Sequence, residues 1–174
     1  MASAMPHSGS VCTRMATTAD VPRILALAEP YARSGLVLDR TAEDVREQLP
    51  SFIIAERGGE AVGCVALRDF GRGLEEIRTL AVDDACQGHG IGTMLVRAAI
   101  HLARERGTTR LFALTVRPNL FVRLGFSVVP KSQFPAKVWS DCRRCSKREH
   151  CDETAVVLHL DGASPPAGDA AAQA

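Results

Sequence analysis

The sequence lacks any long apolar run and any excess of charge of one sign. No stretch approaches the roughly 20 apolar residues that a membrane helix needs, so we predict no membrane span. Lys and Arg together number 21 against 20 Asp and Glu, which gives no reason to expect nucleic acid or anionic lipid as a partner. The opening residues also lack the charged-then-apolar order of a secretory signal, and we therefore expect a cytoplasmic protein.

Aromatic residues are scarce as well, and internal repeats and low-complexity linkers are missing. Aromatic side chains make up 5% of the 174 residues, and the single tyrosine, Tyr31, falls in the first expected helix, where we predict that it packs. The hydrophobic content of 46% is typical of a globular protein. We predict one domain over residues 11–160, with a cysteine-bearing loop at 130–153 and disordered tails at 1–10 and 161–174.

Hydrophobic patterning predicts strands that alternate with helices after an antiparallel start. The expected strands cover residues 10–17, 51–56, 61–68, 74–82, 110–116, 126–129 and 154–160. The expected helices run from Asp20 to about Arg33, over 41–49, from 91 to just before Gly107, and from Pro118 onward. This order favours an α/β protein whose mixed sheet has helices on both faces.

Strand 74–82, "LEEIRTLAV", carries two adjacent carboxylates and an arginine. If it is extended throughout, Glu76 and Arg78 share one face with Leu80 and Val82, and the odd-numbered residues 75–81 point to the other face. An acidic and a basic side chain on one face of a strand could serve a reaction.

Three glycines, Gly88, Gly90 and Gly92, lie at the start of the longest expected helix, in "QGHGIG". A helix N-terminus carries unpaired N–H groups and a partial positive charge, and glycine lets an anion approach them. A tight strand-to-helix turn is the alternative explanation. No Gly-Lys-Ser/Thr follows, which excludes a Walker phosphate loop, and Thr93 stands where a Rossmann loop needs its last glycine.

Gln87, Gly90 and Gly92 fit the acyl-CoA pyrophosphate loop of the GNAT superfamily of N-acetyltransferases, and "LFVRLGF" at 120–126 resembles its closing "FYEKLGF". This resemblance spans about residues 11–160 and implies the GNAT fold, a central, mostly antiparallel sheet flanked by helices on both faces. It also implies acetyl-CoA as co-substrate. The cofactor-binding residues implied by it are Leu80, Ala81, Val82, Gln87, Gly88, His89, Gly90, Ile91, Gly92 and Thr93.

Within that superfamily the sequence resembles the short-form N-acetylglutamate synthases, which are amino-acid N-acetyltransferases. The resemblance is carried by "YARSGLVLDRT", "EEIRTLAV", "LFALT" and "KVWSDCRRCSKREHCDETAVVL". It implies L-glutamate as the acceptor and the first step of arginine biosynthesis. Val37 and Asp39 differ from the residues commoner in that family.

The resemblance also suggests roles for individual residues. Glu76 lies where the superfamily often keeps a general base that acts through water, and the acetyl oxygen is expected to meet the backbone N–H near Leu80. Arg78 and Arg40 suit the two carboxylates of glutamate, with a further hydrogen bond from Thr115. The alternatives are a solvated carboxylate at a strand edge, surface arginines and an ordinary strand threonine.

The general acid stays unassigned. Phe121 occupies the position where many superfamily members have a tyrosine, and a phenylalanine cannot donate a proton. Solvent could protonate the departing thiolate, because the pKa of a thiol is only about 8.5.

Three of the six cysteines, Cys142, Cys145 and Cys151, cluster with His150 in a Cys-x2-Cys-x5-Cys pattern. They could form a structural zinc site, a redox-sensitive thiol group, or reduced cysteines that pack beside Trp139. We assign no metal to the reaction, since thioester aminolysis does not require one. A homodimer is compatible with the sequence. Competing functions are acetylation of another small amine or a protein N-terminus, and a non-catalytic sensor of acyl-CoA or arginine.

Overall fold

The computed structural model describes residues 9–134, 140, 143, 145, 147 and 149–160. Its strands are β1 (Val11–Met15), β2 (Phe52–Arg57), β3 (Glu60–Asp69), β4 (Leu74–Val82), β5 (Arg110–Thr115), β6 (Ser127–Val129) and β7 (Thr154–His159). Its α-helices are α1 (Val21–Arg33), α2 (Ala42–Glu47), α3 (Ile91–Glu105) and α4 (Pro118–Val122). The predicted tail at 161–174, residues 1–8 of the other tail, Cys142 and Trp139 lie outside the described residues.

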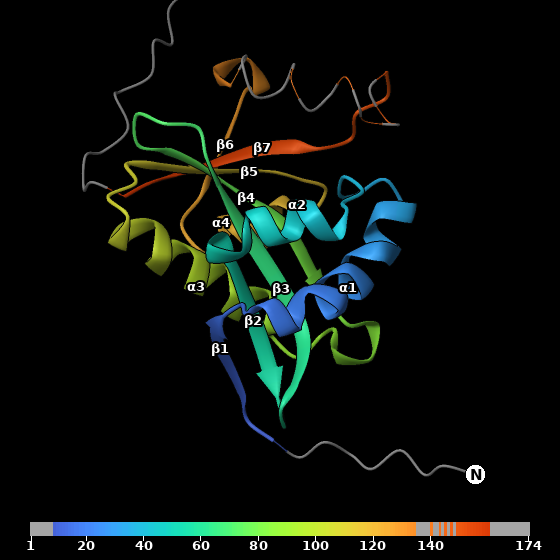
Figure 1. The fold of residues 1–174 in the computed structure, drawn as a ribbon. Coiled ribbons are helices and arrows are strands. Elements are labelled where there is room, and N and C mark those ends of the chain that lie inside the picture. Colours follow the sequence, from blue (N-terminus) through green and yellow to red (C-terminus); the bar gives the residue numbers. More distant parts are fainter. Residues whose placement is uncertain are drawn as a thin grey trace, which may run out of the picture.

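The seven strands form one sheet in the order β1-β2-β3-β4-β5-β7-β6 (Figure 1). The predicted antiparallel start is confirmed: Gly58 and Gly59 join β2 to β3 in a hairpin, with φ of +57° and +84°, values that favour glycine. All neighbouring strands are antiparallel except β4 and β5, which are parallel and connected through α3. The mostly antiparallel sheet with helices on both faces is therefore confirmed.

Helix ends follow the expected chemistry. Thr41 caps α2, and its hydroxyl accepts the Asp44 N–H while the Asp44 side chain accepts the Thr41 N–H. Pro22 occupies the first turn of α1, where its missing N–H costs no helix hydrogen bond. Gly107, at φ +75°, follows the end of α3.

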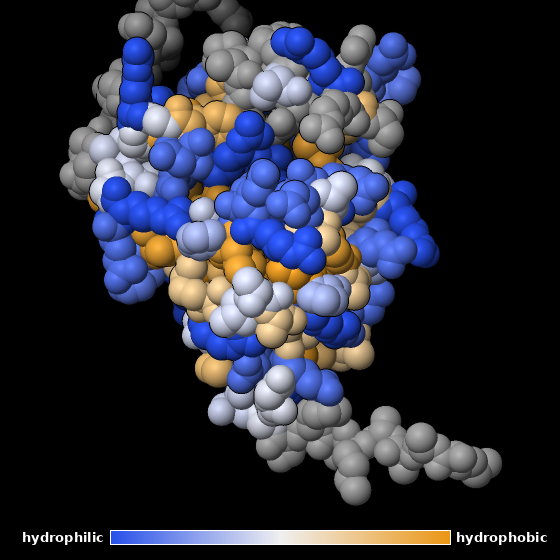
Figure 2. Space-filling model, in the orientation of Figure 1, coloured by the Kyte–Doolittle hydropathy of each residue, from blue (hydrophilic) through white to orange (hydrophobic). Residues whose placement is uncertain are grey.

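Two apolar layers hold the helices on opposite faces of the sheet. On one face α3 and α4 cover the inward side chains of β2 to β5, and on the other face α1 and α2 cover Phe52, Ile54, Cys64 and Ala66 (Figure 1). The apolar face of α3 is centred on Leu95 and its neighbours, and Ala98 and Leu102 lie at the edge of that face. Figure 2 shows polar side chains over much of the α1 and α2 face, with apolar ones between them.

The predicted alternation of β4 is correct up to Arg78 and wrong beyond it. Arg78 pairs with Ala66 and Ala81 pairs with Cys64, so β4 has one more residue than β3 between these pairs. Thr79, at φ +52°, lies in this bulge. Because of the extra residue, each later side chain of β4 points to the face opposite to the one that strict alternation predicts.

Beyond the bulge, Ala81 therefore joins Arg78 on the α1 face, contrary to the prediction. Leu80 and Val82 instead pack toward α3. Only Glu76 and Arg78 of the four residues predicted to share a face do so.

β4 and β5 pair over a short distance and then separate. Their ladder contains three residue pairs and ends at Glu76 with Phe112. The remainder of β4 continues to Val82 beside β3 alone, so its other edge is left without a neighbouring strand. Within the described residues, no helix is both long enough and apolar enough to span a membrane.

Candidate active site

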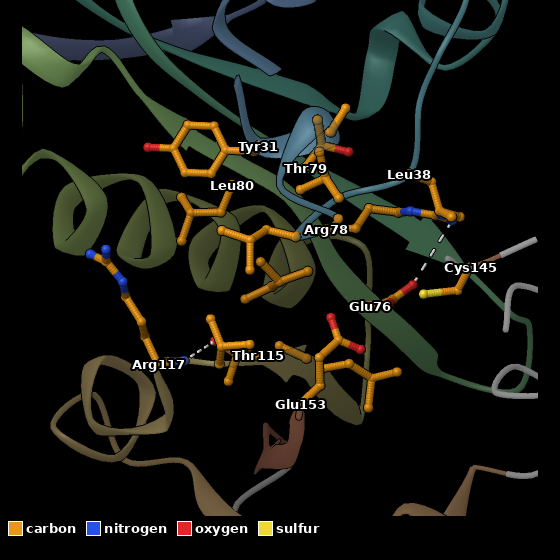
Figure 3. Close-up of a pocket in the computed structure, with 18 of the residues that line it drawn as sticks. Tyr31, Leu38, Glu76, Arg78, Thr79, Leu80, Thr115, Arg117, Cys145 and Glu153 are labelled. Carbon is orange, nitrogen blue, oxygen red and sulfur yellow. Dashed lines mark hydrogen bonds and ion pairs between the residues drawn. The ribbon is translucent and has the colours of Figure 1, made fainter. Parts of the chain in front are cut away.

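A cavity of about 340 Å³ lies where β4 and β5 separate (Figure 3). β4 contributes Glu76 to Leu80 and β5 contributes Ala113 to Thr115. The loop after α1 covers another side with residues 35–40. The rest of the wall consists of Tyr31 and Ala32 of α1, residues 116 and 117, Leu120 and Phe121 of α4, Cys145 and Glu153. The predicted residues Glu76, Arg78, Arg40, Thr115 and Leu80 all border this one cavity.

Glu76 and Arg78 lie side by side in the cavity wall. Their side chains are 5% and 11% exposed, and Glu76 Oε2 is 3.9 Å from Arg78 Nη1. The alternative of a solvated carboxylate at a strand edge is therefore wrong for Glu76. A buried carboxylate next to a cation, facing a cavity, is an arrangement that can accept a proton from a bound molecule.

Arg40 reaches the cavity from the loop after α1. Gly35, at φ +69°, ends the helix, and the Leu36 N–H donates to the Tyr31 carbonyl at 2.8 Å, which sets the direction of the loop. Arg40 is partly buried, and its Nη1 donates to Gln48 Oε1 at 3.3 Å. It is thus held against α2 and is not a surface arginine extended into solvent.

Thr115 and Phe121 form the β5 and α4 side of the cavity. The Thr115 hydroxyl accepts the Arg117 N–H at 2.9 Å, and a hydroxyl that accepts one bond still carries its own proton (Figure 3). Phe121 is 3% exposed and packs edge-on against Phe126, with ring centroids 5.3 Å apart. The side chain at this position is accordingly part of the core.

The glycine turn at the start of α3 has open space beside two of its three glycines. Gly88 and Gly90 have φ of +76° and +78°, and a Cβ on either would meet nothing within 4 Å. Gly90 caps α3, and the first N–H groups of a helix have no partner inside it. The φ of Gly92 does not lie in this positive range, and a Cβ there would come 3.9 Å from a Leu120 side-chain atom, an ordinary contact. The positive φ favours glycine at Gly88 and Gly90. At Gly92 neither the backbone conformation nor the available space requires a glycine.

The other predicted cofactor residues fall into two groups. Gln87 and His89 are exposed in the turn, and Thr93 is partly buried in the first turn of α3. The side chains of Ala81, Val82 and Ile91 are buried, so these residues could contact a ligand through their backbones.

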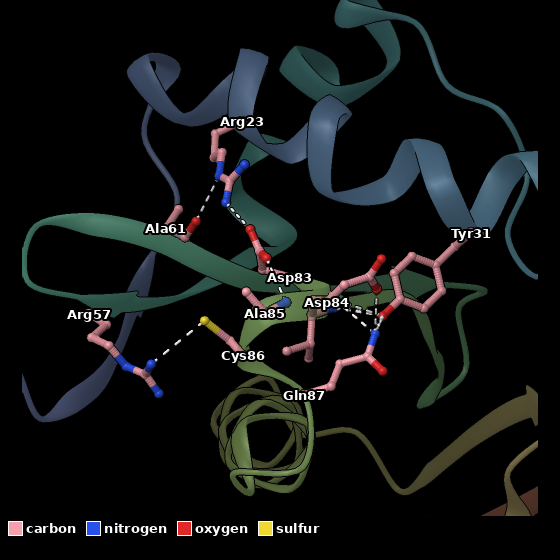
Figure 4. A network of polar contacts seen from close by, with 10 residues as sticks. Arg23, Tyr31, Arg57, Ala61, Asp83, Asp84, Ala85, Cys86 and Gln87 are labelled. Carbon is pink, nitrogen blue, oxygen red and sulfur yellow. Dashed lines mark hydrogen bonds and ion pairs between the residues drawn. The ribbon is translucent and has the colours of Figure 1, made fainter. Parts of the chain in front are cut away.

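A polar network fixes the segment between β4 and the turn (Figure 4). Asp83 accepts from Arg23 and from the Ala85 N–H, and these hydrogen bonds, led by the one from Arg23, hold the pKa of its carboxyl below the usual value. The Tyr31 hydroxyl bonds to Val82 and to Gln87. Tyr31 was expected only to pack, and its polar role depends on residues more than 50 positions away in the sequence.

The cysteine cluster is described only in part. Cys145 borders the cavity, whereas Cys151 is exposed and accepts from Lys131 Nζ at 2.9 Å. Among the described residues, no group of three or more His, Cys, Asp or Glu side chains is arranged to hold a metal ion. Cys142 lies outside those residues, so only part of the predicted set of zinc ligands is described.

The acetyltransferase (GNAT) family model matches residues 19–126, which include α1, β4, the glycine turn, α3, β5 and α4. The chain belongs to this family. A GNAT relative from Chlorobaculum tepidum, named as an uncharacterised N-acetyltransferase, is 37% identical over 153 residues, covering 88% of this chain and 99% of that protein. The amino-acid acetyltransferase of Mycobacterium tuberculosis is 37% identical over 142 residues, covering 79% of this chain and 81% of that protein.

Among solved structures, the GNAT chain is similar to N-acetylglutamate synthase from Neisseria gonorrhoeae, which was solved with coenzyme A and N-acetyl-glutamate. The TM-score is 0.77 at 31% identity, over 88% of this chain and 36% of that chain. The similarity therefore concerns about a third of the Neisseria synthase.

Proposed function

We propose that this protein transfers the acetyl group of acetyl-CoA to the α-amine of L-glutamate. The observation that carries the proposal is the cavity where β4 and β5 separate, which brings Glu76 and Arg78 from one strand together with Arg40 from the facing loop. The relatives named amino-acid acetyltransferase and N-acetylglutamate synthase support glutamate as the acceptor. Under this proposal the protein would catalyse the opening step of arginine biosynthesis.

The open glycine turn fits the diphosphate of the co-substrate. The space in front of Gly88 and Gly90 is free of protein atoms within 4 Å of a Cβ, and the positive end of α3 lies beside it. From there the rest of a coenzyme A molecule can run along the unpaired edge of β4 toward the cavity. This path would place the thioester close to Leu80, whose backbone N–H is the proposed donor to the acetyl oxygen.

The reaction requires a neutral amine, because only its lone pair can attack the thioester carbonyl. Glu76 is the proposed base, and it would accept the proton of the amine through a water molecule. The new C–N bond forms as the C–S bond breaks, and the negative charge that develops on the carbonyl oxygen is stabilised by the Leu80 N–H. The departing thiolate would take a proton from solvent, because Phe121 has no proton to donate and the pKa of a thiol is only about 8.5.

Arginine is suited to hold the acceptor. Its planar guanidinium binds a carboxylate through paired hydrogen bonds, and glutamate has two carboxylates. Arg78 and Arg40 border the cavity from β4 and from the loop after α1, and Thr115 adds a hydroxyl from β5. We propose that each arginine receives one carboxylate, which leaves the amine near Glu76.

The test is a substrate panel with purified protein and acetyl-CoA. Products are identified by mass spectrometry after incubation with L-glutamate, D-glutamate, L-glutamine, L-aspartate, other amino acids and short peptides with free N-termini. We expect N-acetyl-L-glutamate to form with the highest kcat/KM. The matched comparison is L-glutamine, which has nearly the shape of glutamate and one carboxylate fewer, and should lose at least about tenfold.

Two results would contradict the proposal. Acetylation of peptides without acetylation of glutamate would assign the enzyme to another acceptor class. Tight binding of acetyl-CoA with no acetylated product from any amine would instead favour a sensor without catalytic activity.

A further inference from the structure

The edge of β4 beyond the bulge has backbone groups that no strand pairs. Strand N–H and C=O groups point sideways in the plane of the sheet, and β5 pairs with β4 only as far as Glu76. At Val82 both groups are nevertheless bonded, because the Tyr31 hydroxyl donates to the Val82 carbonyl at 2.8 Å and accepts the Val82 N–H at 3.2 Å. The phenol thus takes the place of a neighbouring strand at this one residue.

The same oxygen also reaches the glycine turn. Gln87 Nε2 donates to the Tyr31 hydroxyl at 3.1 Å and to Asp84 Oδ1 at 2.7 Å (Figure 4). A phenol hydroxyl has one proton to donate and two lone pairs with which to accept. With Val82 and Gln87 as partners, Tyr31 uses this entire capacity in the network.

These contacts hold both ends of a short connection. Val82 ends β4, and Gln87 precedes Gly88, the first glycine of the turn. One oxygen atom therefore fixes the end of the strand and the entry to the turn relative to each other. The Tyr31 ring packs against the buried apolar side chains between α1 and the sheet, and a phenylalanine would fill that space equally well. The hydroxyl is the part of this residue that packing does not explain.

We infer that Tyr31 is a positioning residue for the acyl-CoA site, and this inference rests on the proposed function. Its hydroxyl holds the Val82 edge and the glycine turn at the separation that a single coenzyme molecule requires to contact both. The Tyr31 backbone carbonyl accepts the Leu36 N–H in the loop that carries Arg40. The acceptor loop and the co-substrate turn are accordingly attached to the same turn of α1.

The test removes the hydroxyl and keeps the ring. For Tyr31→Phe we expect the Kd of coenzyme A by calorimetry, and the KM of acetyl-CoA, to rise about tenfold, the scale expected for the loss of neutral hydrogen bonds. The kcat at saturating acetyl-CoA should stay within about twofold of the wild type. A residue that only stabilised the fold would lower the melting temperature without this division between KM and kcat.

Arg23→Met provides the matched control. Arg23 lies on the same helix, and its guanidinium bonds to Asp83 and to the Ala61 carbonyl, so it holds the same connection from a different point. It contacts neither Val82 nor Gln87 through these bonds. We expect this variant to lose stability and to keep its affinity for coenzyme A within about twofold.

Three outcomes separate the possibilities. If the wild-type protein binds no coenzyme A, the proposed function fails and so does the inference built on it. If the wild type binds and Tyr31→Phe binds equally well, the positioning role alone is wrong. If Tyr31→Phe binds more tightly, the hydroxyl competes with the co-substrate for Val82, which also overturns the positioning role.

Discussion

Two neighbouring glutamates show how strongly the environment of a residue decides its role. Glu75 and Glu76 are 3% and 4% exposed, and they point to opposite faces of β4. Glu75 accepts from Thr108 Oγ1 at 2.7 Å and from Arg106 Nη1 at 3.0 Å, which ties β4 to the end of α3. Glu76 faces the cavity beside Arg78. The first carboxylate therefore has a structural role, and we propose a chemical role for the second.

The variant Glu76→Gln tests the chemical role. Glutamine keeps the size of the side chain and cannot accept the proton of the amine. We expect kcat to fall about 100-fold or more, in the range typical of general base removal, while the Kd of acetyl-CoA changes less than twofold. Steady-state kinetics across pH together with calorimetry measure both quantities. Full activity at every pH would remove Glu76 from the mechanism.

The variant Glu75→Gln is the matched control for that experiment. It makes the same chemical change one residue away, on the face that packs against α3. Because it weakens a buried charged hydrogen bond, we expect it to lower the free energy of unfolding by about 1–3 kcal/mol. Its kcat should stay close to that of the wild type.

The candidate site residues were predicted from the sequence through its resemblance to the acetyltransferase family. Glu76, Arg78, Arg40 and Thr115 were all expected at the site, and all four border the same cavity. The polar role of Tyr31 was not expected, because a helical tyrosine with apolar neighbours is typical of packing. Its partners become known only when α1 is placed against the end of β4.

At the scale of elements, the bulge at Thr79 determines the shape of the site. It reverses the faces of β4 after Arg78 and coincides with the part of the strand that β5 leaves unpaired. No residue pattern indicated the bulge, because threonine is β-branched and rarely adopts a positive φ. Strict alternation was therefore the reasonable expectation, and it was wrong for Leu80, Ala81 and Val82.

The N-terminus of α3 allows a test in which stability and affinity change in opposite directions. Gly92 lies inside the first turn with no strained φ, and its Cβ would make only an ordinary contact with Leu120. Alanine is a better helix former than glycine by up to about 1 kcal/mol, so Gly92→Ala should raise the melting temperature. If a diphosphate binds there, the added methyl group should raise the Kd of coenzyme A about tenfold or more.

Gly107→Ala is the control at the opposite end of the same helix. Gly107 has φ +75°, and a Cβ there would meet nothing within 4 Å, so alanine at this position encounters backbone strain without a steric clash. We expect a loss of about 1 kcal/mol of stability with unchanged affinity for coenzyme A. Unchanged affinity in Gly92→Ala as well would argue that the turn is merely a tight connection.

At the scale of the whole molecule, the sheet consists of two parts joined along the β4–β5 ladder of three residue pairs. β1 to β4 form one part, with α1 and α2 on one face, and β5 to β7 form the other, where Phe112 stacks on Phe134 with ring centroids 4.3 Å apart. The strands and helices were predicted from local periodicity. Their order in the sheet, including β7 between β5 and β6, depends on contacts between distant segments that periodicity does not contain.

The pH dependence of stability reports on the attachment of β1 to the start of α1. Asp20 accepts from Arg14 of β1 through both carboxylate oxygens, at 2.8 and 2.9 Å, and Arg14 also donates to Glu56 of β2. These bonds, first of all the one from Arg14, lower the pKa of Asp20 from 3.8 to about 2. The folded protein therefore binds the Asp20 proton more weakly than the unfolded chain does.

The lowered pKa of Asp20 determines how this carboxyl changes the stability with pH. The contribution of Asp20 is complete above about pH 5, because its carboxyl is then almost fully ionised in both states, and it is lost as the pH falls toward 2. Since Arg14 is about one-third exposed, we expect Asp20→Asn to cost on the order of 1–2 kcal/mol at pH 7. Urea denaturation at pH 7, 5, 4 and 3 should show the same difference in stability between wild type and variant at pH 7 and 5. This difference should begin to narrow near pH 4 and be clearly smaller at pH 3. Glu29→Gln, which removes an exposed partner of Arg33 within α1, should change stability by less than about 0.5 kcal/mol at every pH. A difference for Asp20→Asn that stayed constant down to pH 3 would mean that the ion pair with Arg14 does not stabilise the fold.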